Sequence, residues 1–245
     1  MSPAAFSFEP IFLALAVAAA VLYVRAARTD PPSTWRAVAF GSGVFLIAAS
    51  LNSPLETIAS KYLLLMHLLQ NALIADVAPL LVVLGLTPRM RAELGRRGLD
   101  RLKPWWILPI WLAAWYCTHI AVFYDWALRT GWGLNVEHGI LIAAGLLFWW
   151  PIVTGRLSPP EGLGYLAIAF VGSSFLGLAY IFSSRSFYSF YEHAPRLWGF
   201  SHVSDQNLGG ILMNGEQTLV FLLAIGWFVL RLLDEEHAQV SLSDS

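Results

Sequence analysis

Seven apolar stretches recur along the chain, and each is long enough, or nearly so, to cross a membrane as a helix. They cover residues 8–26, 35–52, 61–84, 105–125, 134–154, 162–183 and 209–231. A helix needs about 20 predominantly apolar residues to span the hydrocarbon core of a bilayer. The pattern therefore predicts an all-α polytopic membrane protein, a single domain built as a bundle of about seven transmembrane helices.

The polar segments between these stretches differ in positive charge, which predicts the orientation of the chain. If all seven stretches cross, eleven of the 15 Lys and Arg residues fall on one side, six of them in the loop 86–104. Lys and Arg are enriched in cytoplasmic loops. We therefore expect the N-terminus and the loop 184–208 outside, and the tail 232–245 in the cytoplasm. The four basic residues expected outside are Lys61, Arg129, Arg185 and Arg196.

Composition supports a membrane protein and excludes several other classes. The chain is 57% hydrophobic and 13% charged, with a mean hydropathy of +0.61, whereas soluble domains carry about 25% charged residues. A net charge of −1 argues against a nucleic-acid partner. Cys117 is the single cysteine, so no intrachain disulfide, CxxC pair or thiolate zinc site is expected.

No arrangement of residues typical of an enzyme is visible, so we expect a protein without catalytic activity. Glu137 directly precedes His138. Neighbouring helical residues point about 100° apart around the axis. The two are therefore not expected to act as a dyad.

Histidines gather near the outer ends of the predicted helices. His67, His119 and His138 lie in three different helices, each about 6–9 Å below the expected outer end at 1.5 Å per residue. His193 and His202 fall in the predicted outer loop. Ionisable groups within transmembrane segments usually mark function, so we predict that the three helical histidines form one site.

Other polar groups are predicted close to this layer. Asn71 and Asn135 lie about one helical turn from His67 and His138 respectively, on the same helix faces. The last helix brings further candidates to the same end. They are Asp205, Gln206, Met213 and Glu216, with His202 just before them. Asp76 lies nine residues beyond His67 and is expected to face elsewhere in its helix.

This set of side chains suits a metal ion. Imidazole binds copper, zinc and iron, and a thioether such as that of Met213 favours reduced copper. We therefore predict a metal site with His67, His119 and His138 as ligands, open to the outer side. A histidine near a helix end can also serve as an interfacial or interhelical hydrogen-bonding residue, and that alternative stays open.

Four segments resemble the signature segments of the CtaG-type cytochrome c oxidase assembly factors. They are "MHLLQNALIADVAPLLVVLGLTP", "THIAVFYDWAL", "NVEHGILIAAGLLFWWPIVTG" and "SDQNLGGILM". The resemblance covers roughly residues 60–215 and fits seven helices. It implies a multi-pass protein of the bacterial cytoplasmic (inner) membrane. Its partners would be cytochrome c oxidase subunits and the lipid bilayer, and its role the assembly of haem–copper oxidase, with copper delivered on the outer face.

The resemblance also carries over to single residues. His67, His119 and His138 match family histidines. Asp205 and Gln206 match the family's Asp-Gln pair in the last helix, and Met213 matches its methionine. Three positions depart from the family pattern. Asn71 and Asn135 stand where histidines are usual, and Ala121 stands where a proline is frequent. Asn is a poor copper ligand, so the departures predict weaker binding or fewer ligands.

Two other functions remain open from the residues alone. A b-type haem or quinone protein would use two of the three histidines, facing each other, as axial ligands. An ion or proton transporter would use Asp76 and Glu216, which the pattern places near mid-membrane, where transport sites often lie.

Overall fold

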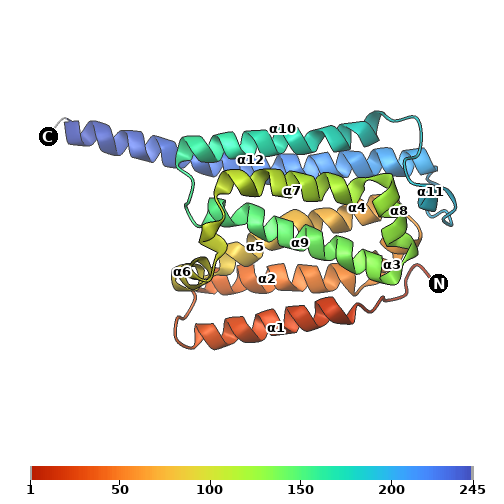
Figure 1. Ribbon diagram of the computed structural model, residues 1–245, viewed down its shortest axis with the longest axis horizontal. Coiled ribbons are helices and arrows are strands. Elements are labelled where there is room, and N and C mark those ends of the chain that lie inside the picture. The colour runs from red at the N-terminus through yellow and green to blue at the C-terminus, as the bar shows by residue number, and fades with distance from the viewer. Residues whose placement is uncertain (1, 244–245) are drawn as a thin grey trace.

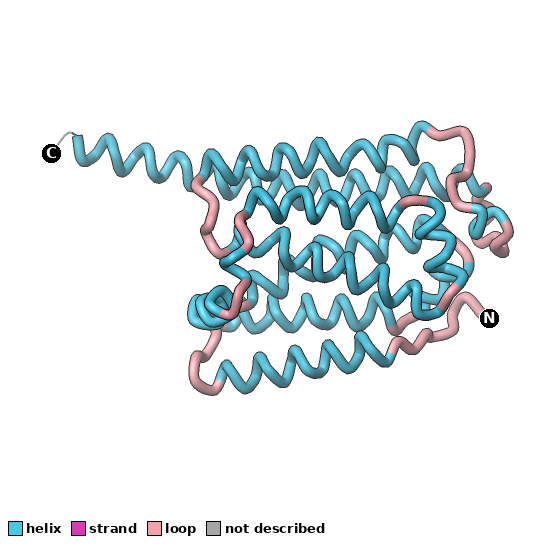
Figure 2. The backbone as a smooth tube through the Cα atoms, in the orientation of Figure 1, coloured by secondary structure: helices cyan, strands magenta, loops and turns pink. Residues whose placement is uncertain are grey.

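The computed structural model describes residues 2–243, and every regular element in that range is helical (Figures 1 and 2). Six helices are long and apolar enough to cross a membrane. A seventh span is complete if two helices joined by a 64° bend are counted as one. The prediction of an all-α polytopic membrane bundle is confirmed.

The helices run side by side, and the connecting segments lie at the two ends of the bundle (Figure 2). The long elements are α1 (Pro10–Ala27), α2 (Thr34–Leu51), α4 (Leu64–Ala72) with its continuations η1 (Leu73–Val77) and α5 (Ala78–Gly85), α7 (Pro104–His119), α8 (Ala121–Arg129), α9 (Gly131–Val153), α10 (Pro159–Phe182) and α12 (His202–Ser243). Shorter elements at the ends are α3 (Pro54–Lys61), α6 (Pro88–Arg96), η2 (Leu99–Arg101) and α11 (Ser189–Glu192).

The third predicted helix, 61–84, is not one regular helix. Lys61 ends the separate helix α3, and α4 begins at Leu64. Farther along, η1 is a single π-helical turn. Pro79 has no N–H to donate to the carbonyl of Ala75, and this carbonyl lies within the π turn. Helix α9 packs closely here, because a Cβ at Gly145 would collide with the Ala75 carbonyl oxygen.

The fourth and seventh predicted helices also end elsewhere than predicted. The predicted helix 105–125 stops at His119, where Ile120 is extended and α8 turns away by 64°. Ala121 is the first residue of α8, a position at which proline is favoured, so the departure from the family pattern falls at a helix start. The helix predicted for 209–231 begins at His202 and continues to Ser243, so much of the expected tail is helical.

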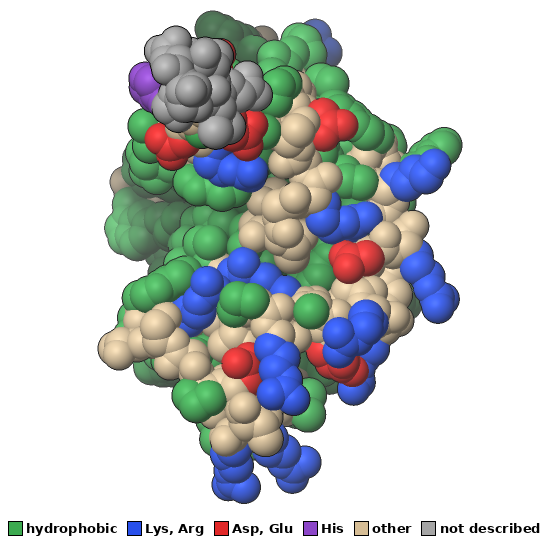
Figure 3. All heavy atoms as spheres, turned by 90° about the vertical axis from the view of Figure 1, so that its left-hand side faces the viewer, with side chains coloured by type: hydrophobic (Ala, Val, Ile, Leu, Met, Phe, Trp, Pro, Cys, Tyr) green, Lys and Arg blue, Asp and Glu red, His purple; other side chains and the backbone are tan. Residues whose placement is uncertain are grey.

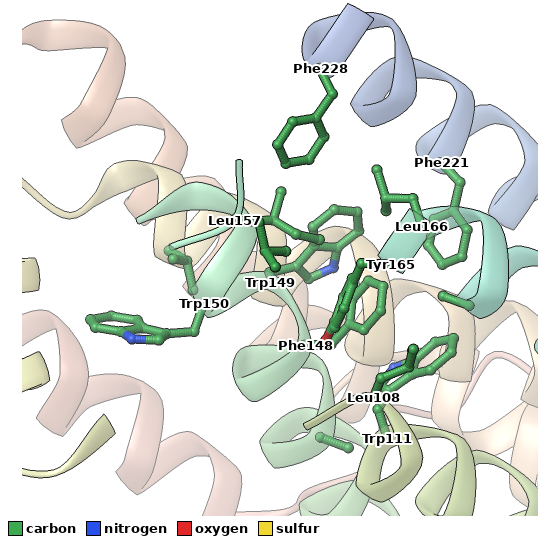
Figure 4. Close-up of a cluster of buried hydrophobic side chains, with 14 of the residues drawn as sticks. Leu108, Trp111, Phe148, Trp149, Trp150, Leu157, Tyr165, Leu166, Phe221 and Phe228 are labelled. Atoms are coloured by element: carbon green, nitrogen blue, oxygen red, sulfur yellow. The ribbon is translucent and has the colours of Figure 1, made fainter. Parts of the chain in front are cut away.

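An aromatic core fills the bundle between α7, α9, α10 and α12 (Figure 4). The rings of Trp111 and Phe148 stack 4.4 Å apart, and those of Phe148 and Tyr165 lie 5.2 Å apart. Phe221 of α12 closes the cluster against Phe148. Helix α1 lies at the edge of the bundle, and Phe12 is its one buried residue. Its exposed apolar surface suits contact with lipid.

The two ends of the bundle differ in charge. The end with α6 and the α1–α2 loop, here called the basic end, displays most of the Lys and Arg side chains (Figure 3). Arg36 and Arg91 both donate there to the Leu84 carbonyl, and Arg36 also donates to the Leu86 carbonyl. The guanidinium groups thereby satisfy carbonyls at the end of α5. The opposite end carries α3, α8 and α11 (Figure 1) and is called the histidine end.

Candidate metal centre

Three side chains at the histidine end could together hold a metal ion. His67 of α4 and Glu137 and His138 of α9 each offer a ligand atom within 4.8 Å of the other two. His67 and Glu137 are fully buried, and His138 is 1% exposed. Of the three predicted ligands, the structure brings His67 and His138 together, with ring centroids 6.0 Å apart.

Hydrogen bonds fix which nitrogen of His67 faces this group. The Tyr191 hydroxyl donates to the Ala59 carbonyl at 2.5 Å and lies 3.0 Å from His67 Nδ1. Because its proton is used by Ala59, the hydroxyl must accept from His67, which places a proton on Nδ1. Nε2 then faces Glu137 Oε1 at 3.2 Å. One proton or one metal cation must lie between these two atoms for the contact to be favourable.

Several buried atoms around the group have no protein partner. They are both ring nitrogens of His138, Oε2 of Glu137 and Oδ1 of Asn71. Asn71 Nδ2 donates to Glu137 Oε1 at 3.1 Å, so the amide lies beside the carboxylate. A buried polar atom without a partner costs about 1–3 kcal/mol. A cation bound by the two imidazoles and the carboxylate would give one ring nitrogen of His138 a partner, so the residues present fit a metal ion.

His119, the third predicted ligand, lies apart from this group. Its Nδ1 is 2.7 Å from the Trp115 carbonyl oxygen, which leaves Nε2 without a partner. The ring of Tyr124 contacts both histidines, with centroid distances of 5.8 Å to His119 and 4.9 Å to His67. His119 is therefore a neighbour of the centre, reached across the Tyr124 ring.

The first turn of α4 is held in place by Asp205. This carboxylate accepts from the backbone N–H groups of Leu64 and Leu65 at 3.0 and 2.9 Å. Side-chain acceptors at a helix N-terminus satisfy N–H groups that have no partner within the helix. Asp205 thus positions His67 one turn farther on, whereas the sequence suggested an auxiliary ligand.

Gln206 and His202 hold the segment 184–201, which brings Tyr191 to the centre. Gln206 accepts from Phe187 N at 2.8 Å and donates to the Arg185 carbonyl at 3.0 Å. His202 Nδ1 lies 2.9 Å from the Tyr191 carbonyl oxygen. Both predicted auxiliary residues therefore bond to the backbone of the segment 184–201.

The remaining predicted auxiliary residues fall into three environments. Asn135 donates to the Gly131 carbonyl at 3.2 Å and faces Glu9, away from Glu137. Met213 is fully buried in the same hydrophobic cluster as Tyr124. Glu216 lies deeper, near Asp76. Among the described residues, Asn71 is thus the one auxiliary candidate whose side chain is hydrogen-bonded to the His67–Glu137–His138 group.

Gln70 lies three residues beyond His67 in α4, but its side chain bonds to partners away from the metal centre. It donates to the Ser50 carbonyl at 2.7 Å and to Glu56 Oε2 at 2.5 Å. Burial raises the pKa of Glu56 to about 7. The Gln70 hydrogen bond and His67 act to lower this pKa, and Glu9 and Glu137 act to raise it further.

Sequence reasoning missed Glu137 and Tyr191. Glu137 does point away from His138 along α9, but this direction aims it at His67 on α4. A carboxylate within an apolar helix was the available signal, because such a group needs a partner. Tyr191 comes from α11, whose backbone N–H groups at Ser189 and Phe190 donate to Asp125 of α8. Nothing local in the sequence indicates that contact.

The comparison with known families agrees with this architecture. A family model described as "Cytochrome c oxidase caa3 assembly factor" matches residues 17–235, which is most of the chain. No curated protein and no solved structure matches the chain. The matched region contains α4 and α9 and the three residues of the candidate centre that they carry. The chain therefore belongs to the family of cytochrome c oxidase caa3 assembly factors.

Proposed function

We propose that this assembly factor holds a copper ion between His67, Glu137 and His138 and passes it to an oxidase subunit on the outer side of the membrane. Copper is the cargo in this proposal and not a resident cofactor. The observation that carries it is the convergence of three ligand atoms within 4.8 Å in a buried site, with the His138 nitrogens unpartnered.

The chemistry of the donors supports an ion that can be released again. Two imidazoles and a carboxylate suit copper or zinc, and copper(II) leads the usual affinity order of divalent metals. The group has no thiolate, the ligand that would hold copper most firmly. Tyr191 fixes His67 with Nε2 toward the site, as second-shell partners of metal-bound histidines generally do. Such a site binds copper without trapping it.

The packing around the group favours a small ion over a haem. The Tyr124 ring lies 4.9 Å from the His67 ring, and Phe12 lies 6.0 Å from His138. Asn71 contacts Glu137 beside them. These side chains occupy the space that a porphyrin between His67 and His138 would need. An absorption spectrum of the purified protein without a Soret band would agree with this assignment.

The histidines lie close to one end of the bundle, which gives the cargo a short route. By the positive-inside rule the basic end faces the cytoplasm, so the histidine end faces outward. The centre is closed there by Tyr191 on α11. Loading and release therefore require the segment carrying α11 to move aside, which makes this segment the contact point for the acceptor subunit.

The decisive experiment is a metal titration of the purified protein with copper(I) under reducing conditions, and with copper(II) and zinc(II) separately. We expect one ion of copper per chain in the wild type and loss of binding in a His67→Ala/His138→Ala variant. His193→Ala is the matched control, because His193 is exposed and its ring Nδ1 lies 2.8 Å from the Ser189 carbonyl oxygen. Unchanged copper binding in the double variant would refute the proposed centre.

A second measurement tests the delivery step in cells. Copper content and activity of the cytochrome c oxidase are compared between cells with the wild-type chain and cells with the double variant. We expect oxidase that lacks copper in the second case, with partial recovery on copper supplementation. If the double variant supports normal oxidase, the family role does not pass through this site.

A further inference from the structure

A second group of buried polar side chains lies deeper in the bundle than the metal centre. Asp76 is fully buried in η1, and neither of its carboxylate oxygens has a hydrogen-bond partner. Glu216 and Gln217 approach it from α12, which packs against η1. The charge of Asp76 acts on Glu216, and the Gln217 amide faces Asp76. No oxygen of either carboxyl group and neither polar atom of the Gln217 amide has a hydrogen-bond partner.

The backbone holds Asp76 firmly at this position. It lies in the π-helical turn Leu73–Val77, and the adjacent carbonyl of Ala75 is in close contact with Gly145 of α9. A π turn within a helix is rare and frequently occurs at a functional site. Gln217 is fully buried, and its amide is directed at the acid pair with no other protein partner. The site therefore has a rigid acid on one helix and a free amide on the other.

No basic group balances these acids. Among the described residues, no basic side chain is a hydrogen-bond partner of any carboxylate oxygen of Asp76 or Glu216. Five elements pack around η1, namely α2, α4, α5, α9 and α12. In the described part of the chain, no Lys, Arg or His of these elements is hydrogen-bonded to either carboxyl group. Two ionised carboxylates here would repel each other in a medium that solvates neither.

We propose that Asp76 and Glu216 form a proton-binding site in the middle of the membrane, which holds at least one proton between the two carboxyls and uses Gln217 as a hydrogen-bonding partner. The ligand is the proton itself. Asp76 belongs to the α4–η1–α5 unit and Glu216 to α12, so the bound proton joins the helix that carries His67 to the last helix. Loss of that proton would place like charges between the two helices and weaken their contact.

Infrared spectroscopy of the full-length purified protein tests this directly, because a protonated carboxylic acid has its own C=O stretching band. The difference spectrum between wild type and an Asp76→Asn/Glu216→Gln variant isolates the pair. We expect this difference to contain a carboxylic acid band at about pH 8, where Glu56 is largely ionised. Glu93→Gln, which changes an exposed carboxylate on α6, should leave the band intact.

Three outcomes would overturn the proposal. The first is a difference spectrum with only ionised carboxylate bands. The second is an acid band that disappears when sodium chloride replaces choline chloride, because the ligand is then a metal cation. The third concerns the single variants Asp76→Asn and Glu216→Gln, which replace the double variant if it does not fold. Each single variant should shift the acid band of the remaining carboxyl. A band that is unchanged in both variants would belong to a carboxyl group other than Asp76 and Glu216.

Discussion

The Nε2 atom of His67 lies 3.2 Å from the Oε1 atom of Glu137, and both side chains are fully buried. This contact joins α4 to α9 inside an apolar bundle. Nδ1 of His67 is already bonded to Tyr191. Nε2 of His67 and the carboxylate of Glu137 therefore face one position that a single cation can occupy. Copper binding should therefore respond to changes in either member of the pair and in the groups that contact it.

Replacing Glu137 by Gln should weaken copper binding while largely preserving the shape of the site. The amide retains an oxygen but loses the negative charge that favours a cation. We expect the dissociation constant for copper to rise about 10–100-fold, the range found when groups that support a metal site are changed. Isothermal titration measures this, with Glu192→Gln as an exposed control from the same end. Equal affinities for Glu137→Gln and wild type would remove Glu137 from the ligand set.

Asn71→His should strengthen copper binding. The Asn71 amide nitrogen is 3.1 Å from Glu137 Oε1, so an imidazole there reaches the same carboxylate and adds a third nitrogen ligand. We expect about tenfold tighter binding, or about 1.4 kcal/mol.

Asn135→His is the matched control for this change. Asn135 bonds to the Gly131 carbonyl and faces Glu9, so a histidine there should not alter copper affinity. Tighter binding from Asn135→His, with none from Asn71→His, would move the centre toward Glu9.

Tyr191→Phe should affect both stability and metal affinity. The change removes a hydroxyl that accepts from His67 and donates to the Ala59 carbonyl at 2.5 Å. A buried group left without a partner costs about 1–3 kcal/mol, and His67 loses the bond that directs Nε2 to the site. We expect a lower thermal midpoint and a copper affinity reduced about tenfold or more.

Tyr116→Phe is the matched control for the hydroxyl of Tyr191. Tyr116 donates to the Gly172 carbonyl at 2.5 Å, but it is exposed and far from the centre. If both tyrosine variants lower copper affinity equally, the effect of Tyr191 is one of general stability and not of ligand orientation.

Stability should fall with rising pH because of Glu56. Burial raises its pKa from 4.5 to about 7, so the folded protein holds this proton more tightly than the unfolded chain does. The stabilisation is complete below the unfolded pKa and is lost as pH rises through about 7, by about 3 kcal/mol. Glu56→Gln should flatten the change in thermal midpoint between about pH 5 and pH 8. A midpoint with the same pH dependence in this variant as in wild type would assign the effect to another group.

Much of the architecture was predictable because membrane helices follow a simple rule. Backbone groups in hydrocarbon must bond within the helix, so long apolar stretches predict α2, α9 and α10 closely. The breaks were less visible. A proline within a helix, such as Pro79, is a sequence signal for a bend, but the π turn before it also depends on the packing of α9 at Gly145. The 64° turn after His119 has no local proline or glycine.

A helical membrane bundle with histidines near one end follows from the amino-acid order, because hydropathy and helical rise are local properties of the chain. The tertiary structure alone decided which polar groups meet. It separated His119 from His67 by the Tyr124 ring, turned Asp205 and Gln206 to backbone partners, and aimed Glu137 at His67. The physical reason is that side-chain packing between helices sets their rotation and register. The order of residues within one helix does not specify that packing.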